Sequence, residues 1–324
     1  MKTSLTGIKP TQKPHLGNYL GAIRPALSMA ETMGESFKTN YFIADYHALT
    51  SVRDPAALRS SVYDVAATWL ACGLDPDKTL LYRQSRVVEV FELSWILSCL
   101  LATGQLERGH SYKDALAKDA SPNAGVFNYP VLMAADILLF DAHRVPVGKD
   151  QKQHLELCRD VAARFNHLYG EDTLVIPEAH ISDAPLVPGT DGEKMSKSRG
   201  NSIPLFAPSK KLRKVVMGIK TGSETLEEPK DAATSTVWQL CQQVDATAAE
   251  AMKVKLAAGN YGWGHAKQDF FEVLEAELGP RRAVYEDYRG DEARLDKILE
   301  AGEARARSVA QSTMARVRKA IGIR

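Results

Sequence analysis

Two lysines separated by two residues form a first candidate for phosphate chemistry. They lie in Lys194-Met195-Ser196-Lys197-Ser198, within a loop rich in Gly and Asp. Two ammonium groups at this spacing can hold a leaving pyrophosphate, because positive charge stabilises the charge that develops on departing phosphate oxygens. Surface loops that contain Lys and Ser by chance are common, but this five-residue string is not.

A second candidate, Pro14-His15-Leu16-Gly17-Asn18, lies where a loop is expected to enter a helix. The unpaired N–H groups at the start of a helix favour anions. Gly17 and Gly21 would let the backbone and a nucleotide approach closely. His15 and Asn18 could donate hydrogen bonds to phosphate oxygens. Alone, the pattern is equally compatible with a Gly-containing turn and an incidental histidine.

The third candidate is Asp136, the one carboxylate in the otherwise apolar stretch 129–140. The stretch is helical by pattern, and Pro130 is typical of a helix N-terminus. A buried carboxylate needs a donor, either an arginine of the protein or an N–H group of a ligand. Tyr129, Met133 and Ile137 share its helix face, which predicts an apolar slot with one acceptor. Such a slot fits an indole.

An α/β framework is expected to position these segments. Residues 3–8, 41–45 and 79–82 resemble strands, and helices are expected from residue 17 and over 55–72. Strand and helix alternation predicts a parallel sheet with right-handed crossovers.

The rest of the chain is expected to be mostly helical. Residues 85–170 show helical spacing with a surface loop at 118–125, and residues 174–177 look like a strand that resumes the sheet. After about residue 205 the apolar spacing is helical nearly to the end.

Composition fits an ordinary globular protein of 324 residues, with 44% apolar and 25% charged side chains. This length accommodates one large domain and a smaller one. No apolar run approaches a membrane span, and the first residues lack the apolar block of a secretory signal, so a cytoplasmic protein without a membrane partner is expected. The four cysteines lie tens of residues apart, which excludes zinc and iron–sulfur ligand spacings and predicts reduced thiols.

The formal net charge of the whole chain is only +1, so it favours no particular class of partner. Residues 301–324 hold six Arg and Lys side chains against Glu303, a local balance of +5. This segment is either a nucleic-acid contact or a solvated helix face.

Taken together, the first two candidates resemble the signatures of class I aminoacyl-tRNA synthetases. His15-Leu16-Gly17-Asn18 resembles the HIGH signature, and residues 194–198 are KMSKS. Their order and separation are typical of the short tryptophan and tyrosine members, and Asn18 in place of the last His is common in the tryptophan branch. Residues 129–140 resemble the tryptophan-binding helix of tryptophanyl-tRNA synthetases, where the matching Asp accepts the indole N–H.

Two further segments resemble the same family. Residues 145–154 match a VPVGxDQxxH block, in which Gly148 and Asp150 would meet the ATP ribose and Gln151 the polar end of tryptophan; Lys149 stands where many relatives have Glu. Residues 45–50 match as well, and His47 would line the amino-acid pocket at the end of a strand. Lys9 differs from the Gln or Thr of relatives, so its backbone is the expected ATP contact.

The resemblance implies three sets of site residues. The catalytic set is His15, Asn18, Lys194 and Lys197. The ATP set is Lys9, Pro10, Thr11, His15, Gly17, Asn18, Gly148, Lys149, Asp150, Leu186, Lys194, Met195, Ser196, Lys197 and Ser198. The tryptophan set is Leu5, Gly7, His47, Tyr129, Met133, Asp136, Ile137, Val145, Val147 and Gln151. No protein-held metal is expected, and Mg²⁺ would arrive with ATP.

The reaction implied is attack of the tryptophan carboxylate on the α-phosphate of magnesium-ATP, followed by transfer of tryptophan to tRNA(Trp). Positioning and charge stabilisation suffice for such chemistry without a covalent enzyme intermediate. The implied fold is a Rossmann-like catalytic domain over 1–205 with a helical insertion at about 85–170. An α-helical, anticodon-binding region over 206–324 follows, with a last helix that could pack back on the catalytic domain. The family resemblance also implies a homodimer.

Three alternatives remain open at this point. A tyrosyl-tRNA synthetase shares the fold, both signatures and a pocket carboxylate. A non-catalytic relative could bind tryptophan or RNA as a regulator, although an intact KMSKS and His15 argue against it. A small-metabolite adenylyltransferase shares HIGH-like loops but would not require the helical C-terminal third.

Overall fold

The computed structural model describes residues 2–34, 37–118, 121–148, 151–181 and 186–323. Within these ranges five parallel strands form one sheet in the order β3-β2-β1-β4-β5. The strands are β1 (Lys2–Ile8), β2 (Phe37–Ile43), β3 (Leu80–Arg83), β4 (Arg144–Val147) and β5 (Glu178–Ile181). The predicted α/β fold with a parallel sheet is confirmed.

The strand order reverses beside β1, the central strand of the sheet. The chain runs outward from β1 through β2 to β3, and later adds β4 on the other side of β1. A crevice forms where successive crossovers leave in opposite directions, at the carboxyl ends of the strands. Lys9 and Gly148, which follow β1 and β4 respectively, lie at this point.

Helices cover the first half of the sheet much as the sequence predicts. After β1, the chain forms α1 (Leu16–Asn18), a single π turn η1 (Tyr19–Ile23) and α2 (Arg24–Met33) without a break. The long helix α4 (Pro55–Ala71) begins at Asp54, whose carboxylate accepts hydrogen bonds from the N–H groups of Ala56 and Ala57. The predicted helix over 55–72 is confirmed, whereas the second strand starts earlier than predicted, at Phe37.

Residues 85–170 hold α5 (Glu89–Ser98), α6 (Thr103–Glu107), α7 (His110–Lys118), α8 (Ala124–Leu139) and α9 (Lys152–Tyr169). Strand β4 interrupts this region. The short elements α3 (Asp45–Ala48) and η3 (Gln84–Arg86) follow β2 and β3.

Two predictions in and just after this region are wrong: the helix start at Pro130 and the strand over 174–177. Pro130 lies inside α8, whose first turn is instead capped by the Asn123 side chain accepting from the N–H of Val126. A proline removes only one helical hydrogen bond, so a long buried helix can retain it. The predicted strand over 174–177 is also wrong: Pro177 has no N–H to donate to a ladder, and β5 starts at Glu178, whose N–H bonds to His143 O at 2.8 Å.

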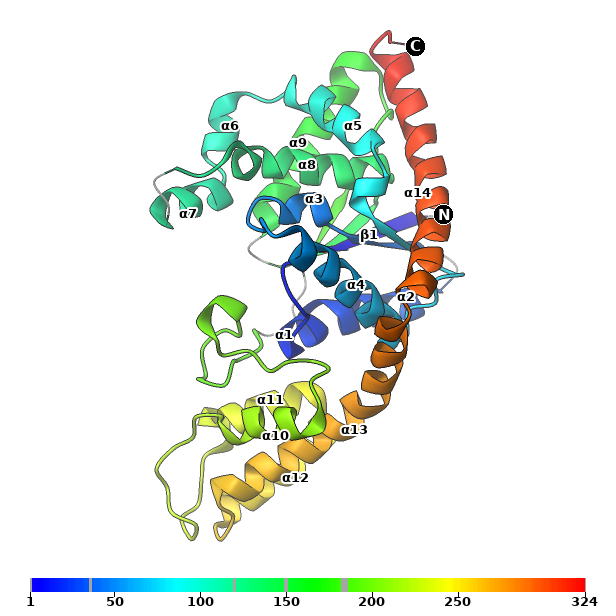
Figure 1. Ribbon diagram of the computed structural model, residues 1–324. Coiled ribbons are helices and arrows are strands. Elements are labelled where there is room, and N and C mark those ends of the chain that lie inside the picture. The colour runs from blue at the N-terminus through cyan, green and yellow to red at the C-terminus, as the bar shows by residue number, and fades with distance from the viewer. Residues whose placement is uncertain (1, 35–36, 119–120, 149–150, 182–185, 324) are drawn as a thin grey trace.

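The C-terminal part contains α10 (Ser209–Met217), η6 (Ala232–Thr234), α11 (Thr236–Val244), α12 (Ala246–Ala258), α13 (Trp263–Gly290) and α14 (Glu292–Ala320). Residues 218–231 form no helix, which corrects the expectation of helix nearly to the end. In Figure 1 the helices α10 to α12 lie apart from the sheet, while α13 and α14 follow one another along one side of the molecule.

Helix α14 packs directly on the edge of the sheet. A Cβ at Gly302 would lie 2.0 Å from the main-chain oxygen of Leu81 in β3, so only glycine permits this approach. Arginines of the basic segment 301–324 bond to the catalytic part: Arg307 to Glu89, Arg316 to Asp141 and Arg318 to Glu92. These arginines dock the helix on the catalytic part, which corrects the expectation of a freely solvated face.

No helix within the ranges that the structure describes is long and apolar enough to cross a membrane.

Candidate active site

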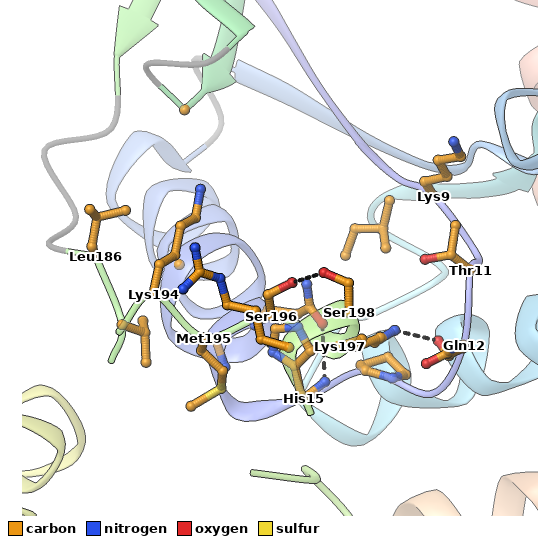
Figure 2. Close-up of a pocket in the computed structure, with 18 of the residues that line it drawn as sticks. Lys9, Thr11, Gln12, His15, Leu186, Lys194, Met195, Ser196, Lys197 and Ser198 are labelled. Carbon is orange, nitrogen blue, oxygen red and sulfur yellow. Dashed lines mark hydrogen bonds between the residues drawn. The ribbon is translucent and has the colours of Figure 1, made fainter. Parts of the chain in front are cut away.

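A cavity of about 990 Å³ opens at the carboxyl ends of β1 and β4 (Figure 2). It lies where the strand order reverses, between the first helices and the loop after β5. Its lining includes these predicted ATP residues: Lys9, Thr11, His15, Gly17, Asn18, Gly148, Leu186, Lys194, Met195, Ser196, Lys197 and Ser198. The structure therefore brings together segments that lie up to 189 positions apart in the sequence, between Lys9 and Ser198. Pro10 is buried beside the cavity, and Lys149 and Asp150 fall outside the described residues.

His15 and Asn18 hold each other at the start of the first helix. His15 Nδ1 accepts from the N–H of Asn18 at 3.3 Å, and Asn18 Oδ1 accepts from the N–H of His15 at 3.0 Å. This reciprocal capping satisfies two N–H groups of the first turn. Because Nδ1 is an acceptor, the neutral imidazole carries its proton on Nε2, which makes it a hydrogen-bond donor.

Gly17 lets the loop after β5 pack against the first helix. Its N–H donates to Met195 Sδ at 3.2 Å, and a Cβ at Gly17 would lie 3.0 Å from the His15 ring. A Cβ at Gly21, by contrast, would meet no described atom within 4 Å, although Gly21 lines the cavity. Gly21 therefore leaves room for a ligand rather than for protein.

Asn201 fixes the shape of the KMSKS loop. Its buried side chain accepts from the N–H of Ser196 at 2.8 Å and donates to Asp191 Oδ1 at 2.7 Å and Lys194 O at 3.2 Å. The buried Met195 bonds through its own N–H to Val187 O at 2.9 Å. Sequence reasoning missed Asn201, and a polar side chain three residues beyond a signature is too weak a signal to find it.

Two basic side chains of the cavity, His15 and Lys197, differ in charge state at neutral pH. Burial lowers the pKa of Lys197 to about 8, although the carboxylate of Asp64 opposes the shift. Burial, and then the charge of Lys197, lower the pKa of His15 to about 4. At neutral pH His15 is therefore uncharged and donates as a neutral imidazole, while Lys197 supplies positive charge.

Lys9 uses its side chain within the protein. Its Nζ donates to Thr50 Oγ1 at 2.7 Å, and burial lowers the pKa of Lys9. The Thr50 hydroxyl in turn donates to His47 O at 2.8 Å. Lys9 thus links the wall of the cavity to the segment that carries His47, a contact the sequence did not indicate.

Asp136 is almost fully buried on α8, and its donors are His47 and Gln84. His47 Nε2 lies 2.8 Å from Asp136 Oδ2, and Gln84 Nε2 donates to Oδ1 at 2.8 Å and Oδ2 at 2.9 Å. Burial raises the pKa of Asp136, and the His47 and Gln84 contacts oppose this rise. The arginine considered as a structural partner is not the donor here. Gln84 was missed, because nothing in its own segment marks it.

Contacts around His47 and one hydrophobic cluster include most of the remaining predicted tryptophan residues. The Tyr129 ring packs edge-on against His47 with centroids 4.8 Å apart, and the Tyr129 hydroxyl donates to Gln151 Oε1 at 3.0 Å. Apolar members share one hydrophobic cluster: Leu5, Ile137, Val145 and Val147, with Met133 against it. Gly7 lies on β1 beside Phe42, whose ring a Cβ at Gly7 would meet at 2.4 Å.

A fold and cavity of this kind define an enzyme of the synthetase type, and comparison with known proteins agrees. Residues 2–279 match the family model described as tRNA synthetases class I (W and Y), and the chain belongs to this family. A tryptophan–tRNA ligase of Xanthomonas axonopodis pv. citri is 49% identical over 99% of this chain and 76% of its own length. That of Rhodopirellula baltica is 48% identical over 99% of both.

Among solved structures, a tryptophanyl-tRNA synthetase from Campylobacter jejuni, complexed with ADP and tryptophan, aligns with a TM-score of 0.91 and 41% identity. The alignment covers 99% of this chain and all of that one. The prediction of an enzyme of the tryptophanyl-tRNA synthetase family is confirmed by these relatives.

Proposed function

We propose that this chain activates L-tryptophan with ATP, releases pyrophosphate and transfers tryptophan from the adenylate to tRNA(Trp). One observation carries the proposal: the first-helix signature and the KMSKS loop line one large cavity after β1, and the buried acceptor Asp136 bonds His47 and Gln84, which follow the neighbouring strands β2 and β3 at the same carboxyl edge of the sheet. The Campylobacter jejuni relative, described with ADP and tryptophan, supports the same pair of ligands.

In the activation step a tryptophan carboxylate oxygen bonds to the α-phosphorus, and the bond from that phosphorus to the bridging oxygen breaks. Pyrophosphate leaves with the electron pair of the broken bond. Lys194 and Lys197 offset this growing negative charge, and His15 and Asn18 donate to phosphate oxygens. ATP brings its own Mg²⁺, which neutralises part of the phosphate charge.

Asp136 has room for one more donor. An ionised carboxylate offers about four lone-pair sites, and the three contacts from His47 and Gln84 leave one on Oδ1. The indole N–H takes that site in our proposal. His47 Nδ1 is buried and has no hydrogen-bond partner among the described residues, which is unusual for a buried polar atom and supports a ligand nearby.

The helical C-terminal part, residues 206–324, binds the anticodon part of the tRNA in this proposal. Exposed cations on α10 support it: Lys210, Lys211, Arg213 and Lys214. Clustered positive charge supplies much of the affinity for a nucleic-acid backbone. Within this region, the ion pairs of Arg307, Arg316 and Arg318 support the packing of the last helix, α14, back on the catalytic part, residues 1–205.

We further propose a cytoplasmic homodimer. Exposed apolar side chains on and beside α5 support it, namely Leu49, Val88, Phe91 and Trp95, of which Trp95 is 72% exposed. Contiguous apolar patches of this kind mark protein interfaces. Trp95→Glu should halve the mass measured by analytical ultracentrifugation, whereas an unchanged dimer would place the interface elsewhere.

ATP–pyrophosphate exchange tests the proposed activity. Exchange should depend on tryptophan and be weak with tyrosine, because a phenol carries its O–H donor at a different position on a smaller ring and would need different partners. Exchange driven by tyrosine would identify a tyrosyl enzyme, and no exchange with any amino acid would identify a non-catalytic relative.

A further inference from the structure

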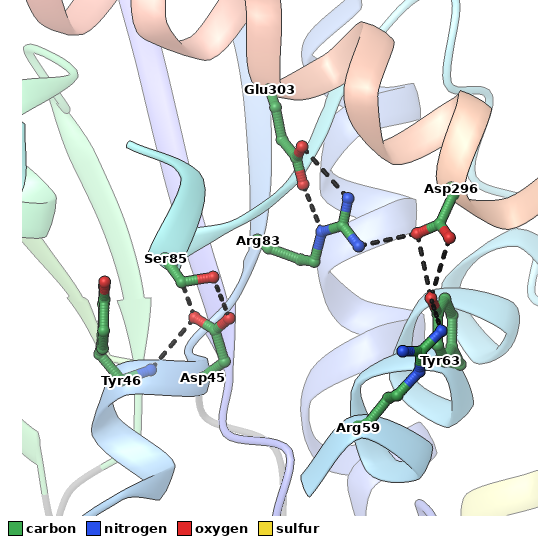
Figure 3. Close-up of polar contacts among 8 residues, drawn as sticks. All are labelled: Asp45, Tyr46, Arg59, Tyr63, Arg83, Ser85, Asp296 and Glu303. Atoms are coloured by element: carbon green, nitrogen blue, oxygen red, sulfur yellow. Dashed lines mark hydrogen bonds and ion pairs between the residues drawn. The ribbon is translucent and has the colours of Figure 1, made fainter. Parts of the chain in front are cut away.

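Three consecutive residues at the end of β3 connect two distant parts of the molecule. Arg83 is the last residue of β3, and Gln84 and Ser85 begin η3. The side chain of Arg83 reaches the C-terminal helix α14, as Figure 3 shows, whereas that of Gln84 reaches Asp136. One short piece of backbone thus lies between the C-terminal helix and the amino-acid side of the site.

Arg83 makes a forked ion pair with α14. Its Nε donates to Glu303 Oε1 at 2.5 Å and its Nη2 to Glu303 Oε2 at 3.2 Å. Its Nη1 donates to Asp296 Oδ1 at 2.8 Å. Arg83 and Glu303 are both buried, being 9% and 6% exposed. A bidentate arginine–carboxylate pair fixes direction as well as distance.

The backbones of α14 and β3 are also in direct contact at this point. Gly302 precedes Glu303 and lies against the carbonyl of Leu81, where no side chain fits. The Asp296 carboxylate also accepts from the Tyr63 hydroxyl of α4, at 3.1 and 3.0 Å. Helix α14 therefore cannot shift along β3 without moving Arg83.

Gln84 and Ser85 connect this fixed backbone to Asp136 and to helix α3 through hydrogen bonds. One amide nitrogen of Gln84 bonds both oxygens of Asp136, which sets the plane of the carboxylate. Gln84 Oε1 accepts from the N–H of Tyr46 at 3.2 Å, and Ser85 bonds Asp45 through its N–H at 2.9 Å and its hydroxyl at 2.5 Å. Asp45 and Tyr46 begin α3, the helix that carries His47.

We propose that Arg83 is a positioning residue for amino-acid recognition. Its ion pair with Glu303 and Asp296 fixes the backbone of residues 83–85, and through Gln84 it holds the free lone pair of Asp136 toward the indole N–H. The proposal rests on the role proposed above for Asp136. It makes the placement of α14, and of the helical part that precedes it, a determinant of tryptophan affinity.

Glu303→Gln tests the proposal, because it removes the charge and keeps the shape of the side chain. Calorimetric affinities for tryptophan and for a benzothiophene analogue, in which sulfur replaces the N–H, give a discrimination ratio. The ratio should fall roughly three- to tenfold in Glu303→Gln. The affinity for ATP should not change, because none of its proposed ligands bonds Arg83 or Gln84.

A double-mutant comparison separates positioning from general damage. In a Gln84→Ala background, Glu303→Gln should leave the ratio unchanged, because the connection is already broken. Glu92→Gln is the matched control: it breaks the Arg318 pair, another arginine–glutamate contact between α14 and the catalytic part. It should lower the melting temperature without changing the ratio. If Glu303→Gln does not fold, Asp296→Asn, whose carboxylate is 33% exposed, makes the same test through Arg83 Nη1.

The outcomes distinguish the two proposals. A reduced ratio in Asp136→Asn together with an unchanged ratio in Glu303→Gln would overturn the role of Arg83 and keep that of Asp136. An unchanged ratio in both variants would overturn both. If Glu303→Gln lowers the ratio by the same factor in the Gln84→Ala background as in the wild type, the proposed route through Gln84 is also wrong.

Discussion

Lys197 Nζ donates a 3.0 Å hydrogen bond to the main-chain oxygen of Gln12, which joins the loop after β5 to the loop after β1 (Figure 2). A single neutral carbonyl is a modest partner for an ammonium group, and phosphate oxygens are stronger ones. Lys197 is thus held at the cavity wall but remains available to a polyphosphate.

Lys197→Ala should lower the rate of pyrophosphate exchange by about a hundredfold, the usual effect of losing one transition-state donor. Tryptophan affinity should change little, because the ammonium acts on the leaving group. Exchange kinetics and calorimetry measure the two effects, with Lys210→Ala on exposed α10 as the control. An unchanged exchange rate would remove KMSKS from the mechanism.

The pKa of Lys197 predicts a pH dependence. Because burial lowers this pKa to about 8, the ammonium form of the free enzyme is lost above that pH. The kcat/KM for ATP should therefore fall above about pH 8, since this quantity reports the free enzyme. Lys197→Arg, whose guanidinium stays charged, should keep part of the activity and lose the fall.

The predicted fall in kcat/KM above pH 8 cannot come from a loss of stability caused by deprotonation of Lys197. Its pKa is lower in the folded chain than the ordinary 10.5, so the unfolded chain binds more protons between about pH 8 and 10.5. The contribution of Lys197 to stability then rises with pH over that window. A melting temperature that follows the activity downward in this range would point to another cause.

Asp136→Asn should reduce discrimination between tryptophan and the benzothiophene analogue. A charge-assisted hydrogen bond contributes about 1.5–3 kcal/mol, so tryptophan binding should weaken roughly tenfold or more. The asparagine NH2 also meets the donors of His47 and Gln84, which will lower the melting temperature. Titration of both ligands on folded protein is decisive, and an unaltered ratio would leave Asp136 a purely structural residue.

Charge reversal on α10 tests the proposed tRNA contact. Lys211→Glu with Lys214→Glu should lower the kcat/KM of aminoacylation for tRNA at least about tenfold at low salt, because each reversed charge repels phosphate. Pyrophosphate exchange should stay unchanged. Lys78→Glu, an exposed lysine before β3, serves as the control, and equal aminoacylation by all three proteins would move the contact away from α10.

The sequence predicted those parts of the site that are encoded locally. KMSKS and the His15 segment carry their chemistry within five residues, and the apolar face around Asp136 follows from helical spacing. The donors to Asp136 could not be predicted, because Gln84 lies 52 positions away and only the sheet order brings it close. The contact between Thr50 and Lys9 could not be predicted for the same reason, since 41 positions separate these residues. Asn201 bonds residues only 5 to 10 positions away, but one polar side chain beyond a signature is too weak a signal to identify it.

The errors have local physical causes. Pro130 was expected to start a helix, yet Asn123 caps it earlier and the buried helix tolerates the proline. The arginines after residue 301 looked like a basic surface, because their acidic partners Glu89, Glu92 and Asp141 lie about 175 to 226 positions earlier in the chain. Net charge along a segment does not reveal such long-range pairing.

The contact between Gly302 and Leu81 has a consequence for how the protein is made. Strand β3 bonds to β2 on one side only, and α14 covers its other side. An uncovered strand edge is a template for pairing with other chains. Since α14 is synthesised after every other helix and strand described, the catalytic sheet keeps a bare edge while the nascent chain grows. Substitutions at Gly302 should therefore show up first as aggregation during expression, and only then as altered catalysis.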